Sequence, residues 1–303
     1  PPPPNWSPRS RRAEARRPVA CQCTSASFSS MDDLSSWTAN WPVGWASIGV
    51  TDSASTRGAG PDPDEPFRVA SISKTMVGVA ALVALEEESV SLDEPAGPEG
   101  STVRHLLAHA SGLGFDSDRQ IAPVGRRRVY SNAGIEVFCT HLTERTGIPF
   151  EAYLREAVFE PLGMTSTELR GSPAHAVHST ITDLLTYARE LLTPRLVSTE
   201  TLVMATRPHF PDLAGMLPGM TSFDPNPFGL TFEVRGHKHP HWTAPSNSPS
   251  TFGHFGGSGS FLWVDPEARL AAVSIADQAF GDWSLDEWPV VSERILETYS
   301  DRQ

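Results

Sequence analysis

Two residues three positions apart, Ser71 and Lys74, are the strongest candidates for covalent chemistry in this chain. They begin a segment, running to about Glu88, whose apolar run MVGVAALVAL predicts a buried helix. The spacing places both side chains on one helical face, and free amides at the helix start favour a developing negative charge. Only Lys74 and Lys238 are lysines among 24 basic residues. Because a desolvated lysine can lose its proton and arginine cannot, the pair predicts a serine nucleophile with a neutral lysine base. The alternative is an N-cap serine beside a solvent-reaching lysine.

A tyrosine and an asparagine precede another predicted helix, over 132–147. In Tyr130-Ser131-Asn132 the phenol could shuttle a proton and the amide could hydrogen-bond a substrate. The alternative is a plain helix cap made by Ser131 or Asn132.

A glycine-rich segment, Gly253-His254-Phe255-Gly256-Gly257, comes just before a predicted strand. Glycines at this density let a substrate approach the backbone and leave an amide free to bind an oxyanion. The alternative is a flexible loop with an exposed histidine.

Strand patterns near both ends of the chain enclose a block of helical patterns. Strands are predicted over 44–50, 67–70, 228–234, 260–264 and 269–276, with a hairpin turn at Asp265-Pro266-Glu267-Ala268. Helices are predicted over 101–109, 132–147, 149–160, 180–193, 198–206 and 284–299. This order predicts an α+β fold, an antiparallel sheet flanked by helices, with a mainly helical subdomain at about 75–206 inserted in it. The domain is expected over 31–303, with residues 1–30 a disordered tail or a non-native start.

Composition excludes several classes of function. The formal net charge of −12 over 303 residues disfavours binding to nucleic acid or to an anionic membrane. No apolar run is long enough to span a bilayer, and the first thirty residues do not read as a secretory signal, so a cytoplasmic protein acting on a small molecule is expected. The sequence leaves the oligomeric state open.

Several histidines and cysteines resemble metal ligands but lack a complete pattern. His237, His239 and His241 are interrupted by Pro240, so a solvated loop is favoured over a zinc site. His105 and His109 lack the glutamate of a zinc protease helix, which favours packing. Cys21 and Cys23 have no further ligands near them. No cofactor and no metal are predicted.

Together these motifs resemble the serine β-lactamase and D,D-peptidase superfamily, closest to its class C and esterase branch. The similar segments are PFRVASISKTM, TVRHLLAHASGL, YSN, PLGM and GHFGG, and the resemblance covers roughly Ile48 to Ile295. The stretch between Met31 and Ser71 is shorter than usual for that branch, which puts the first strands of the sheet in question.

The resemblance implies roles for seven residues. Ser71 is the acylated nucleophile, Lys74 its proton partner and Tyr130 a general base or acid. Asn132, His254, Gly256 and Gly257 are expected to contact the substrate, with the amides of Ser71 and Gly257 binding the oxyanion. His254 stands where class C β-lactamases carry a lysine. It is expected to be only partly charged near neutral pH, which favours an esterase over an efficient β-lactamase. A D-amino-acid peptidase or amidase, or a non-catalytic penicillin-binding sensor, remain alternatives.

Overall fold

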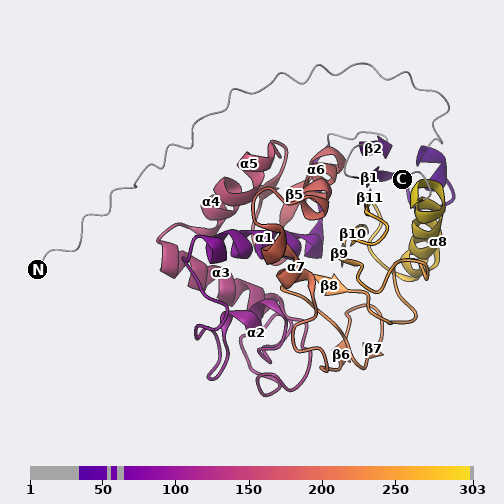
Figure 1. Ribbon diagram of the computed structural model, residues 1–303. Helices are drawn as coiled ribbons and strands as arrows, with labels where there is room; N and C mark the ends of the chain where they lie inside the picture. The colour runs from indigo at the N-terminus through magenta and orange to yellow at the C-terminus, as the bar shows by residue number, and fades with distance from the viewer. Residues whose placement is uncertain (1–33, 53–55, 60–64, 301–303) are drawn as a thin grey trace, which may run out of the picture. The chain divides into compact units, whose positions relative to one another are not determined.

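A six-stranded antiparallel sheet forms the centre of the computed structural model, which describes residues 34–52, 56–59 and 65–300 (Figure 1). The strand order is β2-β1-β11-β10-β9-β8. The strands are β1 (Ala46–Thr51), β2 (Thr56–Ala59), β8 (Glu233–Val234), β9 (Phe252–Gly256), β10 (Ser260–Asp265) and β11 (Leu270–Ala276). Pairing of β1 with β11 therefore joins the first strand of the described chain to the last.

The residues of β1 and of β8 to β11 are all buried, and successive residues of a strand point to opposite faces. On β10, Leu262 and Val264 belong to the apolar cluster shared with α1 (Ser73–Glu86) and α6 (Ile181–Leu192). Phe261 and Trp263 face helix α8 (Asp282–Tyr299), where the Trp263 indole donates to Ser292 Oγ at 3.1 Å. Because neither face meets water, these strands read as continuous apolar runs.

Most of the helices lie in the chain between β2 and β8. They are α1, α2 (Val103–Leu107), α3 (Asn132–Thr146), α4 (Phe150–Leu154), a π-helical turn (Arg155–Phe159), α5 (Glu160–Leu162), α6 and α7 (Thr199–Thr206). Short 3-10 helices occupy Leu34–Trp37 and Ala70–Ile72. Two small sheets accompany them, formed by β3 (Phe67–Arg68), β5 (Val177–Ser179) and β4 (Glu168–Leu169), and by β6 (Gly215–Met216) and β7 (Ser222–Phe223).

The architecture confirms the predicted α+β class, and most helices begin within two residues of the expected positions. The short segment before Ser71 nevertheless supplies both β1 and β2. The expected strand over 67–70 is only Phe67–Arg68, and it pairs with β5 outside the main sheet. The expected N-terminal tail and the Cys21–Cys23 pair lie outside the described residues.

The predicted strand over 228–234 was wrong in its first five residues. Thr231 has a φ of 68°, and its amide donates to Leu107 O while the Leu230 amide donates to Ala205 O. These bonds hold the segment against the helices, so only Glu233 and Val234 join the sheet. Side-chain pattern alone does not reveal which backbone partner a short apolar run takes.

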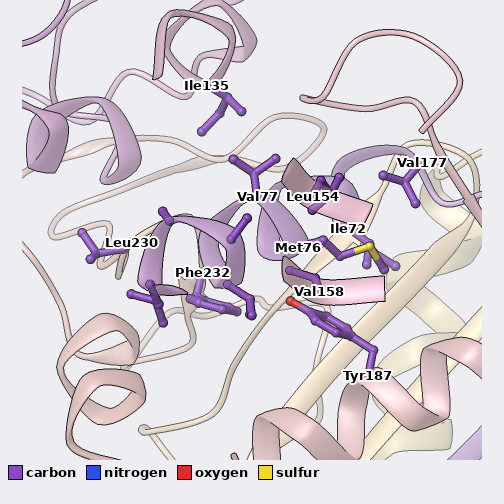
Figure 2. Close-up of a cluster of buried hydrophobic side chains, with 14 of the residues drawn as sticks. Ile72, Met76, Val77, Ile135, Leu154, Val158, Val177, Tyr187, Leu230 and Phe232 are labelled. Carbon is purple, nitrogen blue, oxygen red and sulfur yellow. The ribbon is translucent and has the colours of Figure 1, made fainter. Parts of the chain in front are cut away.

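Helix α1 runs through the middle of the helical region and is buried along nearly its whole length (Figures 1 and 2). Figure 2 shows Met76 and Val77 surrounded by side chains from α3, α4, α6 and the 228–232 segment. Gly78 lets the 228–232 segment approach α1 closely. A Cβ there would lie 2.1 Å from Thr231 Oγ1 and 3.0 Å from Leu230 O.

We therefore expect Gly78→Ala to destabilise the protein by about 2 kcal/mol, because the added methyl has no space beside Thr231. The matched control is Gly134→Ala in α3, where the Cβ would make ordinary contacts at 3.4 Å or more. That change should be neutral or stabilise by up to about 1 kcal/mol, since alanine favours a helix. Urea unfolding measures both; equal effects would contradict the packing argument.

Candidate active site

The Ser71 and Lys74 side chains meet as the spacing predicted. Ser71 lies in the 3-10 turn Ala70–Ile72, and Lys74 lies in the first turn of α1. Lys74 Nζ is 3.1 Å from Ser71 Oγ and donates to Ala174 O at 2.8 Å. Ser71 remains partly exposed while Lys74 is fully buried. A reagent can therefore reach the hydroxyl, and the amine behind it is shielded from water.

The backbone before the serine is held in an uncommon conformation. Ala70 has a φ of 46°, in the left-handed region that costs a residue with a side chain about 1 kcal/mol or more. Ser73 Oγ donates to Ala70 O at 2.6 Å and accepts from the Val177 amide at 3.1 Å. This link to β5 fixes the turn that presents Ser71.

Burial sets the charge state of Lys74. Burial lowers the pKa of the amine from 10.5 to about 7, although the negative charges of Asp116 and Glu136 act to raise it. The positive charge of Arg68 also lowers it. Near neutral pH, a substantial fraction of Lys74 is therefore the neutral amine, which can accept a proton from Ser71.

Tyr130 lies over the lysine and is hydrogen-bonded to His254. Lys74 Nζ is 4.8 Å from the Tyr130 ring centre, and Tyr130 Oη is 3.1 Å from His254 Nε2. His254 Nδ1 is 2.6 Å from Phe255 O. A carbonyl only accepts, so Nδ1 carries the proton and Nε2 accepts from the phenol. Burial raises the pKa of Tyr130, so the phenol keeps its proton at neutral pH.

The expected partial charge on His254 is not what the structure gives. His254 is 2% exposed, and burial together with the charge of Lys74 lowers its pKa to about 4. The imidazole is therefore neutral between pH 6 and 8. It supplies an acceptor for Tyr130 rather than a positive charge for a substrate carboxylate.

Asn132 begins α3, directly after the cap residue. Ser131 Oγ accepts from the Gly134 amide at 2.8 Å, which confirms the cap predicted as the alternative for this triplet. Asn132 Nδ2 donates to Asp116 Oδ1 at 2.7 Å, and its Oδ1 is buried without a partner. The cap thus orients the amide that sequence reasoning assigned to the substrate.

The glycine-rich segment forms β9 and the turn after it. A Cβ on Gly256 would lie 2.4 Å from Val69 O and 3.2 Å from Ala70 Cβ. The end of β9 therefore lies against the turn that carries Ser71. Gly257 follows, exposed, and a Cβ there would meet nothing within 4 Å.

His109 is a neighbour of the site that sequence reasoning assigned only to packing. Its ring lies 4.6 Å from that of Tyr130, and its Nδ1 accepts from the Ser131 amide at 3.2 Å. Burial holds its pKa well below the usual value. The sequence offered one sign of a role for His109, its position in the TVRHLLAHASGL segment that resembles the family. Its contact with Tyr130 could be seen only in the folded structure.

The expected solvated loop over 237–241 is wrong for two of its residues. His237 and His239 are exposed, whereas Lys238 and His241 are buried and both bind Glu233, with His241 Nε2 at 2.9 Å. Although burial opposes it, the charges of Lys238 and His241 hold the pKa of Glu233 far below its usual value. This buried network anchors the segment after β8.

Two further features are lacking in the described residues, a metal-binding cluster and a membrane-spanning helix. No group of three or more His, Cys, Asp or Glu side chains is arranged to hold a metal ion. Within the same residues, no helix has the length and apolar character needed to cross a membrane.

Comparison with known proteins gives a family match over most of the chain. The beta-lactamase family model matches residues 34–291. The chain belongs to the beta-lactamase family. Two curated beta-lactamases match as well, one from Escherichia coli K12 at 27% identity over 135 residues and one from Yersinia enterocolitica at 31% over 129 residues. These matches cover 36% and 33% of this chain, and the same shares of the two relatives, so only about a third of each relative's length is matched.

Solved structures extend the likeness over 86% or more of the chain. A crystal structure described as a beta-lactamase from Mycobacterium bovis is 48% identical, with a TM-score of 0.84, and covers 86% of this chain and 97% of that one. An octameric penicillin-binding protein homologue from Pyrococcus abyssi, at 17% identity and a TM-score of 0.70, covers 89% of this chain and 77% of that one. A mutant simvastatin synthase from Aspergillus terreus, also 17% identical, has a TM-score of 0.69 and covers 86% of this chain and 95% of that one. The last two share the fold.

In this family member the contact between β9 and the Ser71 turn can be tested with a pair of glycines. Gly256→Ala should slow acylation of Ser71 by about 100-fold, because Val69 or the strand must shift and misplace the hydroxyl. Gly281→Ala, just before α8, is the control, because its Cβ would meet only Trp283 Cδ1 at 3.8 Å, so its rate should stay within about threefold of the parent. Rates of labelling by a fluorescent fluorophosphonate measure this, with thermal unfolding to verify folding. Equal rates in the two variants would contradict the assignment.

Proposed function

We propose that this protein is a serine hydrolase that works through an acyl-enzyme on Ser71. The observation that carries the proposal is the fully buried Lys74 amine, 3.1 Å from the Ser71 hydroxyl, with its pKa lowered by burial to about 7. Burial lowers the pKa of any lysine; what points to a base is that this neutral amine lies within hydrogen-bond distance of the Ser71 hydroxyl, which stays partly exposed.

The proposed acylation moves one proton and exchanges one bond. Ser71 Oγ attacks the substrate carbonyl carbon as its proton passes to Lys74 Nζ, and the amides of Ser71 and Gly257 bind the oxyanion. When the tetrahedral intermediate collapses, the bond to the leaving group breaks. Tyr130 protonates the leaving atom and is reprotonated from Lys74. Water then enters by the same route and releases the acid.

The proposed substrate is an ester or amide rather than a β-lactam. His254 is buried and neutral, so it gives the site no fixed positive charge for the carboxylate that β-lactams carry. Its Nε2 is already used by Tyr130. The same geometry would serve a D-amino-acid peptidase or amidase, and a sensor that stays acylated would differ only in failing to release the acid.

The nucleophile and its base are tested together by the pH dependence of labelling. A fluorophosphonate should label Ser71, with a rate that rises as pH increases through about 7, because the neutral amine forms there. Lys74→Arg should lower the rate by about 10³-fold, since arginine stays charged. Glu136→Gln removes a charge that raises the pKa of Lys74, so its midpoint should move to lower pH.

The matched control is Glu151→Gln, an exposed carboxylate on α4 that does not act on Lys74. Its midpoint should stay at the parent value. Near-normal labelling of Lys74→Arg, or peptide mapping of the label to Ser258, would show the proposed assignment to be wrong.

Substrate class is tested with a neutral ester against a chromogenic cephalosporin. We expect kcat/KM for p-nitrophenyl butyrate to exceed that for nitrocefin by about tenfold or more, because nothing at His254 attracts the cephalosporin carboxylate. Nitrocefin turnover equal to or above ester turnover would contradict the esterase proposal. Stoichiometric acylation without product release would instead favour the sensor.

A further inference from the structure

A cavity of about 560 Å³ lies along α3 beside the candidate active site. Its volume is in the range of small-molecule sites. Four carboxylates line it, from Asp116, Asp118, Glu136 and Glu144, and Asn132 lines it as well. Asn132, one of the residues proposed to bind substrate, therefore belongs to the wall of this cavity.

The charge of this cavity is strongly one-sided. No arginine or lysine is among the described residues that line it, and its one histidine, His141, is bound to Glu94 at 2.6 Å. The positive end of the α3 dipole amounts to about half a charge, against four full negative ones. An anionic group would be repelled from this space.

The amide of Asn132 adds an acceptor that has no partner. Asp116 can only accept, so Asn132 must turn its NH₂ group toward Asp116, at 2.7 Å. The amide oxygen is then left buried and unpaired in a residue that is 6% exposed. A buried acceptor without a donor costs about 1–3 kcal/mol, so an N–H group arriving there would be stabilised.

Two of the carboxylates also link the cavity to the nucleophile. The charges of Asp116 and Glu136 both act on Lys74, and Glu136 accepts from Ser172 Oγ. Ala174, two residues after Ser172, accepts from Lys74 Nζ. A group held in the cavity would thus be within reach of the electrostatic field around the reacting serine.

We infer that this cavity binds a cationic N–H donor of the substrate, an ammonium or guanidinium group, while Ser71 attacks the carbonyl. The inference rests on the proposed function for its catalytic part. It deepens that proposal, because it names the chemical class of substrate: esters or amides whose acyl part carries a positive charge.

The test compares three p-nitrophenyl esters that differ at one end. Their acyl parts are 4-(aminomethyl)phenylacetyl, 4-ethylphenylacetyl and 4-(carboxymethyl)phenylacetyl, which are cationic, neutral and anionic in otherwise similar shapes. We expect kcat/KM to fall in that order, with the cationic ester about tenfold above the neutral one at low ionic strength and less at high salt.

Two double variants distinguish the effect of the cavity carboxylates from the effect of the protein's total charge. In Asp118→Asn/Glu144→Gln the cationic-to-neutral ratio should fall toward one. Asp286→Asn/Glu297→Gln removes two exposed charges from α8 instead, and should keep the parent ratio. A ratio that is unaffected by the first pair, or affected equally by both, would overturn the inference while leaving the proposed hydrolase intact.

Binding without turnover keeps the test independent of catalysis. If none of the esters is hydrolysed, the proposed function fails, and calorimetry with 4-(aminomethyl)phenylacetamide and 4-ethylphenylacetamide decides the cavity alone. Tighter binding of the cationic amide, lost in Asp118→Asn/Glu144→Gln, supports the inference. Equal binding of the two amides overturns it.

Discussion

The site depends on one unfavourable burial, that of the Lys74 amine. An isolated ammonium is costly in an apolar interior, and the cost is relieved either by a partner charge or by loss of the proton. Here the carboxylates of Asp116 and Glu136 act on the amine without contacting it in an ion pair, so burial prevails and the pKa falls to about 7. A closer carboxylate would have kept the lysine charged and useless as a base.

Maintaining this balance requires the surrounding packing. Helix α1 is enclosed along nearly its whole length, which removes water from Lys74, while Ser71 lies two residues before the helix, in the 3-10 turn, and stays partly exposed. The strained Ala70 backbone, held by Ser73, and the close passage of Gly256 against Val69 place that turn. The hydroxyl is partly exposed and the amine is buried because Ser71 belongs to the 3-10 turn and Lys74 to the α-helix that follows it.

The second balance concerns His254 and Tyr130. A lysine at position 254 would be a second cation near Lys74, and either would then depress the pKa of the other. A neutral imidazole avoids this repulsion and offers Tyr130 an acceptor. His254 therefore carries no charge that would attract a substrate carboxylate, and the neighbouring cavity along α3 is lined by carboxylates.

The sequence by itself determined the fold class, the principal helices, the C-terminal hairpin and the pairing of Ser71 with Lys74, because each depends on local periodicity or on spacing within one helix. The tertiary structure decided what required distant segments to meet. Tyr130 and His254 are 124 residues apart, and the protonation of His254 follows from its burial there. The 228–232 segment does not form the predicted strand because two of its amides hydrogen-bond to the carbonyls of Leu107 and Ala205 instead of to a strand. Lys238 and His241 are buried rather than part of the expected solvated loop, because both hydrogen-bond to the Glu233 carboxylate inside the protein. Each of these outcomes depends on burial or on hydrogen-bond partners far away in the chain. A local sequence pattern contains information about neither.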